Sequence, residues 1–140
     1  MIILIHMNID FVGIGSLSID LIKIKNKIYK RYGGPAINTA AFLQNFGLKT
    51  GVIGRVGSDQ DGLKILQKLN NFGIDTSRVF IDQNLPTTVG QIVVENNERE
   101  ILDIKNLKRL DNFREEDKDY LKCSKSILIC LLYTSPSPRD

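Results

Sequence analysis

Segments with the spacing of β-strands alternate with segments that have the spacing of helices along this 140-residue chain. The strand-like segments are short and rich in Ile, Val and Phe, and the helix-like segments begin near Pro or Asp and end at Gly. This alternation predicts an α/β fold with a parallel sheet and right-handed crossovers. The predicted strands of this sheet are 11–15, 50–56, 78–81 and 126–129, and the predicted helices begin at Pro35, at Ser58 or Asp59, and at Asp111.

Two hairpins interrupt the alternation. Residues 21–25 and 28–32 have period-two patterns on either side of a tight Asn-Lys turn, which predicts a hairpin with one polar face. Residues 87–94 and 99–104 flank a polar turn and predict a second antiparallel hairpin.

The composition excludes several classes of protein. With 42% hydrophobic and 25% charged residues, the chain is neither disordered nor collagen-like. Its 19 basic and 16 acidic residues are interleaved, so we expect no nucleic-acid partner. No apolar run reaches the roughly 18 residues that a membrane span needs, so we expect no membrane partner either. Cys123 and Cys130 lack a matching His cluster, which favours a reducing, cytoplasmic setting over a zinc site or a disulfide framework.

Both ends of the chain differ from the rest. Met7 directly precedes the first strand pattern, so we interpret residues 1–6 as an upstream extension. Residues 130–140 shift to a Ser-Pro string that matches the translation of a sequencing adapter, with a natural Ser-Pro tail as the alternative. The expected domain therefore covers residues 7–129.

Four features of the first half suggest a binding site. Asp20 follows the first strand, Gly33 and Gly34 precede a helix, Asn38 lies one turn into that helix, and a Gly- and Asp-containing segment covers residues 57–62. Glycines before a helix let a ligand approach its free N–H groups. A carboxylate can accept hydrogen bonds from two hydroxyls, and an amide can both donate and accept. Together these residues predict a site for a hydroxylated small molecule where the strands end.

Each feature alone also has a structural explanation. A Gly-Gly pair is ordinary turn geometry, Asp20 can be a surface residue, and Asn38 can be a helix-surface amide. The sequence has no P-loop, no dinucleotide-binding fingerprint and no metal-ligand cluster. Only the combination favours the site.

Three motifs carry a resemblance to a known family. They are Gly-Gly-Pro-Ala-Ile-Asn-Thr-Ala at 33–40, Gly-Arg-Val-Gly-Ser-Asp-Gln-Asp-Gly at 54–62 and Asn-Phe-Gly-Ile-Asp-Thr at 71–76. Over residues 8–104 the chain resembles the N-terminal part of the ribokinase-like (PfkB) carbohydrate and nucleoside kinases. The resemblance implies an αβα sandwich with a doubly wound, Rossmann-like sheet. It also implies that Asp20, Gly34 and Asn38 hold substrate hydroxyls and that Gly33 shapes the loop.

The implied activity is transfer of the ATP γ-phosphate, with Mg²⁺, to a hydroxyl of a sugar, polyol or nucleoside. In this family the catalytic aspartate follows a Gly-Ala-Gly motif in the second half, and nothing after Ile104 resembles it. We therefore name no catalytic residue and expect this chain alone to be inactive. The alternatives are a non-catalytic sugar-binding module and a fragment without a function of its own. Asp117 and Asp119 are predicted to lie on a solvated helix face.

The chain departs from the family in two places. Only twelve residues separate Asp20 from Gly33, which reduces the expected lid to the hairpin of residues 21–32 and argues against dimerisation through it. Pro35 stands where several sugar kinases have lysine, so the resemblance does not identify the substrate.

Overall fold

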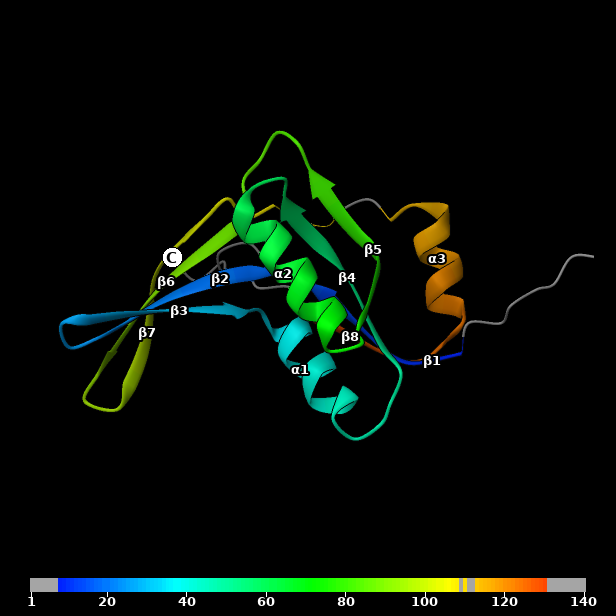
Figure 1. Cartoon of the computed structure of the whole chain (residues 1–140), viewed down its shortest axis with the longest axis horizontal. Coiled ribbons are helices and arrows are strands. Elements are labelled where there is room, and N and C mark those ends of the chain that lie inside the picture. The colour runs from blue at the N-terminus through cyan, green and yellow to red at the C-terminus, as the bar shows by residue number, and fades with distance from the viewer. Residues whose placement is uncertain (1–7, 109, 111–112, 131–140) are drawn as a thin grey trace, which may run out of the picture.

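The computed structural model describes residues 8–108, 110 and 113–130, which form two β-sheets and three helices (Figure 1). The expectations for residues 1–6 and 131–140 lie outside these residues. None of the helices described is long and apolar enough to cross a membrane. The elements are β1 (Ile9–Gly15), β2 (Ser18–Ile24), β3 (Lys27–Gly33), α1 (Pro35–Gln44), β4 (Thr50–Gly57), α2 (Gln60–Asn71), β5 (Asp75–Asp82), β6 (Thr88–Glu95), β7 (Glu98–Lys105), α3 (Glu115–Lys122) and β8 (Ser124–Cys130).

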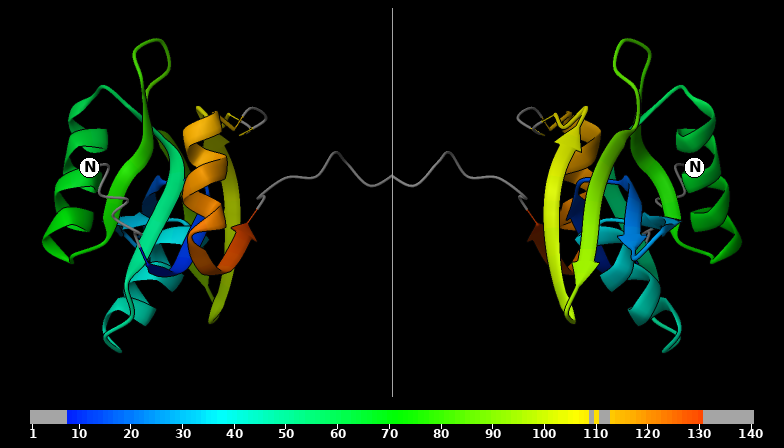
Figure 2. Two further views of the ribbon diagram at one scale, coloured as in Figure 1. Left: turned by 90° about the vertical axis from the view of Figure 1, so that its right-hand side faces the viewer. Right: turned by 90° about the vertical axis from the view of Figure 1, so that its left-hand side faces the viewer.

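The first sheet is parallel and has the strand order β5-β4-β1-β8. Helices α1 and α2 cover one of its faces and α3 covers the other (Figure 2). The predicted α/β class and its αβα layering are therefore confirmed. Strand β8 extends through Cys130, which pairs with Gly15.

Alternating side chains of the buried strand β4 supply both hydrophobic layers. Val52 and Val56 pack in one cluster with Ile65 and other apolar side chains of α1 and α2. Ile53 belongs to the opposite cluster, which contains Tyr120 of α3. A strand that is apolar on both faces needs helices on both faces, as observed.

The second sheet has the order β3-β2-β6-β7 and extends from one end of the first (Figure 1). Both predicted hairpins are confirmed, as β2–β3 and β6–β7. The structure adds that β2 pairs with β6 in parallel, which joins the two hairpins into one sheet. The twelve-residue hairpin is therefore only half of the sheet that lies beside the candidate site.

Helix α3 overturns one prediction. Asp117 is only 3% exposed, so it does not lie on a solvated helix face, whereas the side chain of Asp119 is 72% exposed. Asp117 accepts a hydrogen bond from the backbone N–H of Arg114 at 3.0 Å and forms an ion pair with its guanidinium at 2.9 Å. Arg78 of β5 lies 3.7 Å away. Arg114 is the N-cap of the same helix, three residues before Asp117, whereas Arg78 comes from a distant strand and the helix pattern could not reveal it.

Candidate substrate-binding site

Asp20 lies at the centre of the candidate site. The sequence placed it just after the first strand of the parallel sheet, and the structure places it within β2 of the second sheet. Its side chain is 19% exposed. The hydroxyl of Ser18 donates to Oδ1 at 3.2 Å, and Nη2 of Arg99 lies 3.5 Å from Oδ2. The carboxylate is thus held in place while part of it stays accessible.

Glycines on both neighbouring strands make room for this carboxylate. A Cβ atom on Gly33 of β3 would lie 2.8 Å from Oδ2 of Asp20. A Cβ atom on Gly90 of β6 would lie 3.2 Å from Oδ1. Gly33 therefore leaves space beside Asp20 that a larger residue would fill.

Gly34 connects the second sheet to helix α1. Its φ of +114° lies in a region that favours glycine, and a Cβ atom there would lie 2.1 Å from the carbonyl oxygen of Ser16. Helix α1 begins at the next residue, Pro35, as predicted. Asn38 lies one turn later, where its backbone N–H donates to the carbonyl of Gly34 at 3.0 Å and its side chain is exposed.

A cavity of about 360 Å³ brings these parts together. Asp20, Gly34 and Asn38 line it, whereas Gly33 lines an adjoining cavity of about 610 Å³ together with Asp20 and Asn38. The four predicted site residues therefore lie around one region, although they come from β2, β3 and α1. The first cavity is also lined by Ser16, Ser18, Pro35, Thr88, Gly90, Ile92, Arg99, Ile101 and Ile104.

None of these further lining residues was predicted from the sequence as a site residue, and Arg99 and Ser16 are among them. Arg99 is the second residue of β7 in the second hairpin, and nothing in the sequence indicates that this hairpin pairs with the strand that contains Asp20. Ser16 lies between β1 and β2, and its hydroxyl is buried without a hydrogen-bond partner among the residues described. A buried hydroxyl normally has a partner, so this one is available to a ligand.

The segment 57–62 does not belong to the site. Asp59 caps α2 by accepting from the N–H of Gly62 at 2.8 Å. It also accepts from the N–H of Thr87 at 2.8 Å and from the hydroxyl of the same residue at 2.5 Å. Burial raises the pKa of Asp59, but these hydrogen bonds outweigh burial and lower it below its ordinary value. Its acceptor capacity serves the fold, which corrects the prediction that this segment joins the binding site.

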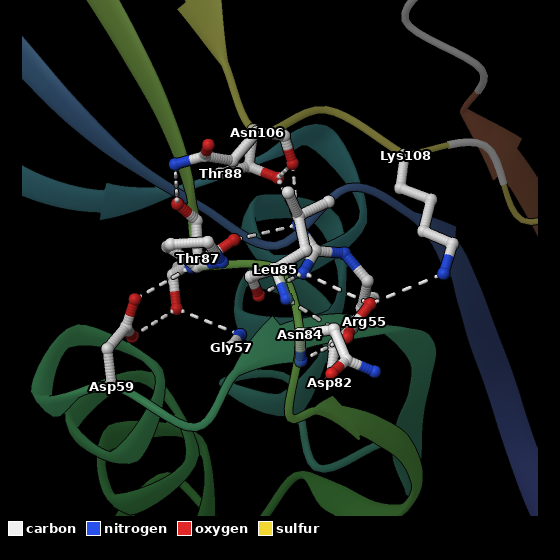
Figure 3. Close-up of polar contacts among 11 residues, drawn as sticks. Arg55, Gly57, Asp59, Asp82, Asn84, Leu85, Thr87, Thr88, Asn106 and Lys108 are labelled. Atoms are coloured by element: carbon white, nitrogen blue, oxygen red, sulfur yellow. Dashed lines mark hydrogen bonds and ion pairs between the residues drawn. The ribbon is translucent and has the colours of Figure 1, made fainter.

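Arg55 of β4 anchors the loop that leads into the second sheet (Figure 3). Its guanidinium donates to the carbonyls of Leu85 at 2.9 Å, Pro86 at 3.0 Å and Asn106 at 2.6 Å. The side chain is only 5% exposed, and a carboxylate oxygen of Asp82 lies 3.7 Å away. Since β6 begins and β7 ends beside these carbonyls, Arg55 ties the second sheet to the first.

The arrangement is suited to binding a polyol. One carboxylate, one amide, one guanidinium and three hydroxyl-bearing residues line a cavity whose remaining wall is largely apolar. Such groups can orient hydroxyls by hydrogen bonding. Among the residues described, no group of three or more His, Cys, Asp or Glu side chains is placed to hold a metal ion.

Solved structures with this fold are sugar kinases. A fructokinase of Halothermothrix orenii superposes with a TM-score of 0.75 at 20% identity, covering 86% of this chain and 46% of the fructokinase. An uncharacterised sugar kinase of Pyrococcus horikoshii gives a TM-score of 0.75 at 23% identity, covering 85% of this chain and 42% of that kinase. The fold is therefore that of the ribokinase-like sugar kinases.

The sequence comparison identifies the family. The pattern of the pfkB family carbohydrate kinases matches residues 6–140, and the chain belongs to this family. A 5-dehydro-2-deoxygluconokinase of Geobacillus kaustophilus is 32% identical over 93% of this chain and 42% of its own length. A fructoselysine 6-kinase of Escherichia coli is 33% identical over 61% of this chain and 32% of its own length. The chain spans less than half the length of these relatives.

Proposed function

We propose that this chain forms the substrate-binding part of a kinase that phosphorylates a hydroxyl group of a small carbohydrate. The observation that carries the proposal is the cavity shared by Asp20, Gly34 and Asn38. Asp20 accepts hydrogen bonds from substrate hydroxyls, and Asn38 both accepts and donates. Their part in catalysis is to position the reacting hydroxyl.

The proposed substrate is a sugar acid or a related polyol. By its name, the relative from Geobacillus kaustophilus phosphorylates a gluconate derivative, and it aligns over 93% of this chain. A gluconate derivative carries several hydroxyls for Asp20 and Asn38, together with a carboxylate that is ionised at neutral pH. Neutral sugars and nucleosides are the other candidates.

ATP with Mg²⁺ is the proposed phosphoryl donor. Another structure of the Pyrococcus horikoshii kinase contains ATP, which supports this choice. In the part of the chain that the structure describes, no group of three or more His, Cys, Asp or Glu side chains is placed to hold the metal ion. We assign no residue of this chain to ATP, and we propose that these 140 residues alone bind substrate without transferring phosphate.

Calorimetric titration with neutral polyols tests the binding site. D-Glucitol, ribose and myo-inositol are titrated into the wild-type chain and into Asp20→Asn, which removes the charge but keeps the shape. We expect at least one polyol to bind and Asp20→Asn to weaken it about tenfold or more, the loss expected for a charge-assisted hydrogen bond. Asp103→Asn is the matched control, because Asp103 is exposed on the same sheet and does not line the cavity.

Four outcomes are informative. Binding that is lost only in Asp20→Asn supports the proposed site, and absence of saturable binding refutes it. ATP turnover that a polyol stimulates, in a preparation freed of contaminating kinases, would refute the proposal that the chain alone is inactive. Polyol binding by the longer natural protein without ATP turnover would instead favour a non-catalytic sugar-binding module.

A further inference from the structure

We propose that Arg99 is a specificity residue that pairs with an anionic group of the substrate, so that the site prefers sugar acids to neutral polyols. This inference rests on the proposed function and deepens it. It assigns the charged end of the substrate to strand β7 and the hydroxyl-bearing part to Asp20 and Asn38.

The charges that line the cavity carry the argument. Arg99 is the only cation among the residues that line the 360 Å³ cavity, and Asp20 is the only anion. The two charges lie at neighbouring points of the wall, 3.5 Å apart, because β2 and β7 both flank β6. A ligand that contacts Asp20 through its hydroxyls therefore lies within reach of Arg99.

Arg99 also has hydrogen-bonding capacity to spare. A guanidinium carries several N–H donors in a planar fork that matches a carboxylate. None of the side-chain hydrogen bonds found among the residues described involves the guanidinium of Arg99, and its contact with Asp20 is an ion pair at 3.5 Å through Nη2 alone. The side chain is 59% exposed, so solvent weakens this pair. A bound carboxylate can therefore gain charge-assisted hydrogen bonds that Asp20 does not supply.

The cavity also distinguishes the two ends of such a ligand. Ser16, with its buried and unpartnered hydroxyl, and Asn38 contribute neutral polar groups to the same wall. These groups suit hydroxyls and carry no charge to neutralise an anion. Arg99 is thus the one group lining this cavity that favours a carboxylate over a hydroxymethyl group at the same position of the ligand, whereas Asp20 repels a carboxylate.

A matched pair of probes isolates this discrimination. D-Gluconate and D-glucitol differ in having a carboxylate or a hydroxymethyl group at one end of the same polyol. Their affinities are measured by calorimetry for the wild-type chain, Arg99→Gln, Arg99→Lys and Lys105→Gln. The last variant is the control for net charge, because Lys105 is an exposed residue of the same strand and does not line the cavity.

We expect the wild-type chain to bind D-gluconate about tenfold more tightly than D-glucitol, as one paired carboxylate would give. Arg99→Gln should abolish that preference while changing D-glucitol affinity less than about twofold, and Arg99→Lys should retain part of it. Lys105→Gln should behave as wild type. Far-UV circular dichroism and a urea titration show whether each variant is folded.

The failure of this inference differs from the failure of the proposed function. If D-glucitol binds and depends on Asp20 but Arg99→Gln keeps the preference for D-gluconate, Arg99 is not the specificity residue and the site still stands. Equal weakening of both ligands in Arg99→Gln also overturns the inference, because Arg99 would then act only through Asp20. Absence of binding by both probes refutes the site and the inference together.

Discussion

Replacing Arg55 with leucine tests whether this arginine fixes the position of the second sheet. The substitution removes a guanidinium that is 5% exposed and leaves an apolar side chain in its place. The carbonyls of Leu85 and Pro86 lose this donor, the carbonyl of Asn106 keeps only the hydroxyl of Thr88 at 3.1 Å, and Asp82 loses one of its two cationic partners. Burial lowers the pKa of Arg55 and the charge of Asp82 opposes that shift, but an arginine stays protonated at neutral pH.

The size of the effect follows from the three carbonyls. A hydrogen bond to a charged group contributes about 1.5–3 kcal/mol, and loss of the donor leaves a partly buried acceptor unsatisfied. Water can reach some of these carbonyls, because Pro86 is exposed and Leu85 is half-buried. We therefore expect Arg55→Leu to lower the free energy of unfolding by about 3–5 kcal/mol, in line with broken buried ionic networks. Such a loss is a large share of the 5–15 kcal/mol that stabilises an ordinary domain.

Urea denaturation followed by circular dichroism measures this difference. Arg31→Leu is the matched control, because Arg31 is exposed on β3 and should change the free energy of unfolding by less than about 0.5 kcal/mol. Arg55→Lys keeps the positive charge but lacks the planar guanidinium with its several N–H donors, so its free energy of unfolding should lie between those of wild type and Arg55→Leu. If the free energy of unfolding of Arg55→Leu lies within about 1 kcal/mol of the wild-type value, the three hydrogen bonds do not stabilise the fold and the argument fails.

Three further outcomes are expected. Gly34→Ala should be more destabilising than Gly47→Ala by at least about 1 kcal/mol in urea titrations, because both glycines have positive φ but only Gly34 would place a Cβ atom against backbone; equal effects would contradict this. Burial raises the pKa of Asp117, but the two arginines beside it outweigh burial, so that the pKa is lower than that of an ordinary aspartate. The ionised carboxylate therefore stabilises the fold fully above the ordinary pKa, and this stabilisation is lost as pH falls through the lowered pKa. Below about pH 4 the wild-type chain should therefore lose stability more steeply than Asp117→Asn, and parallel curves would refute this. Tyr120→Phe removes the 2.8 Å hydrogen bond to Asp75 and should cost about 1 kcal/mol in the same urea assay, whereas an unchanged midpoint would show that the bond contributes nothing.

Local patterns were sufficient to predict most elements of the fold. Strands 50–56 and 78–81 lie within β4 and β5, the helix that begins at Pro35 is α1, and Asp59 is the N-cap of α2. Each of these elements is specified by residues close together in the sequence: by the periodicity of apolar residues, by a proline in the first turn of a helix, or by a carboxylate that caps a helix. The pairing of β2 with β6 depends on residues some seventy positions apart, and nothing local specifies it.

The residues of the candidate site could be proposed from the sequence where they depend on residue type, and Arg99 was missed because it depends on long-range pairing. Asn38 belongs to the 33–40 motif, and Asp20 could be singled out by its place after the first strand and before that motif. Arg99 contacts Asp20 only because β6 lies between their strands. Asp117 was misplaced in part for the same reason, since one of its two arginine partners, Arg78 of β5, is distant in sequence, although the other, Arg114, is only three residues away.

The site spans the two sheets, and this arrangement limits how it can work. Asp20 belongs to the second sheet, whereas Asn38 belongs to a helix packed on the first. A ligand that contacts both is therefore sensitive to the angle between the sheets, since a shift of about 1 Å is enough to spoil the alignment of a reacting group. Gly34 lies where the chain passes from the second sheet to α1. Arg55 and the carbonyls that it binds lie where the chain enters the second sheet at β6 and leaves it after β7. The close backbone approach at Gly34, which also lines the candidate cavity, and the buried guanidinium of Arg55 would thus restrain the same angle from two sides.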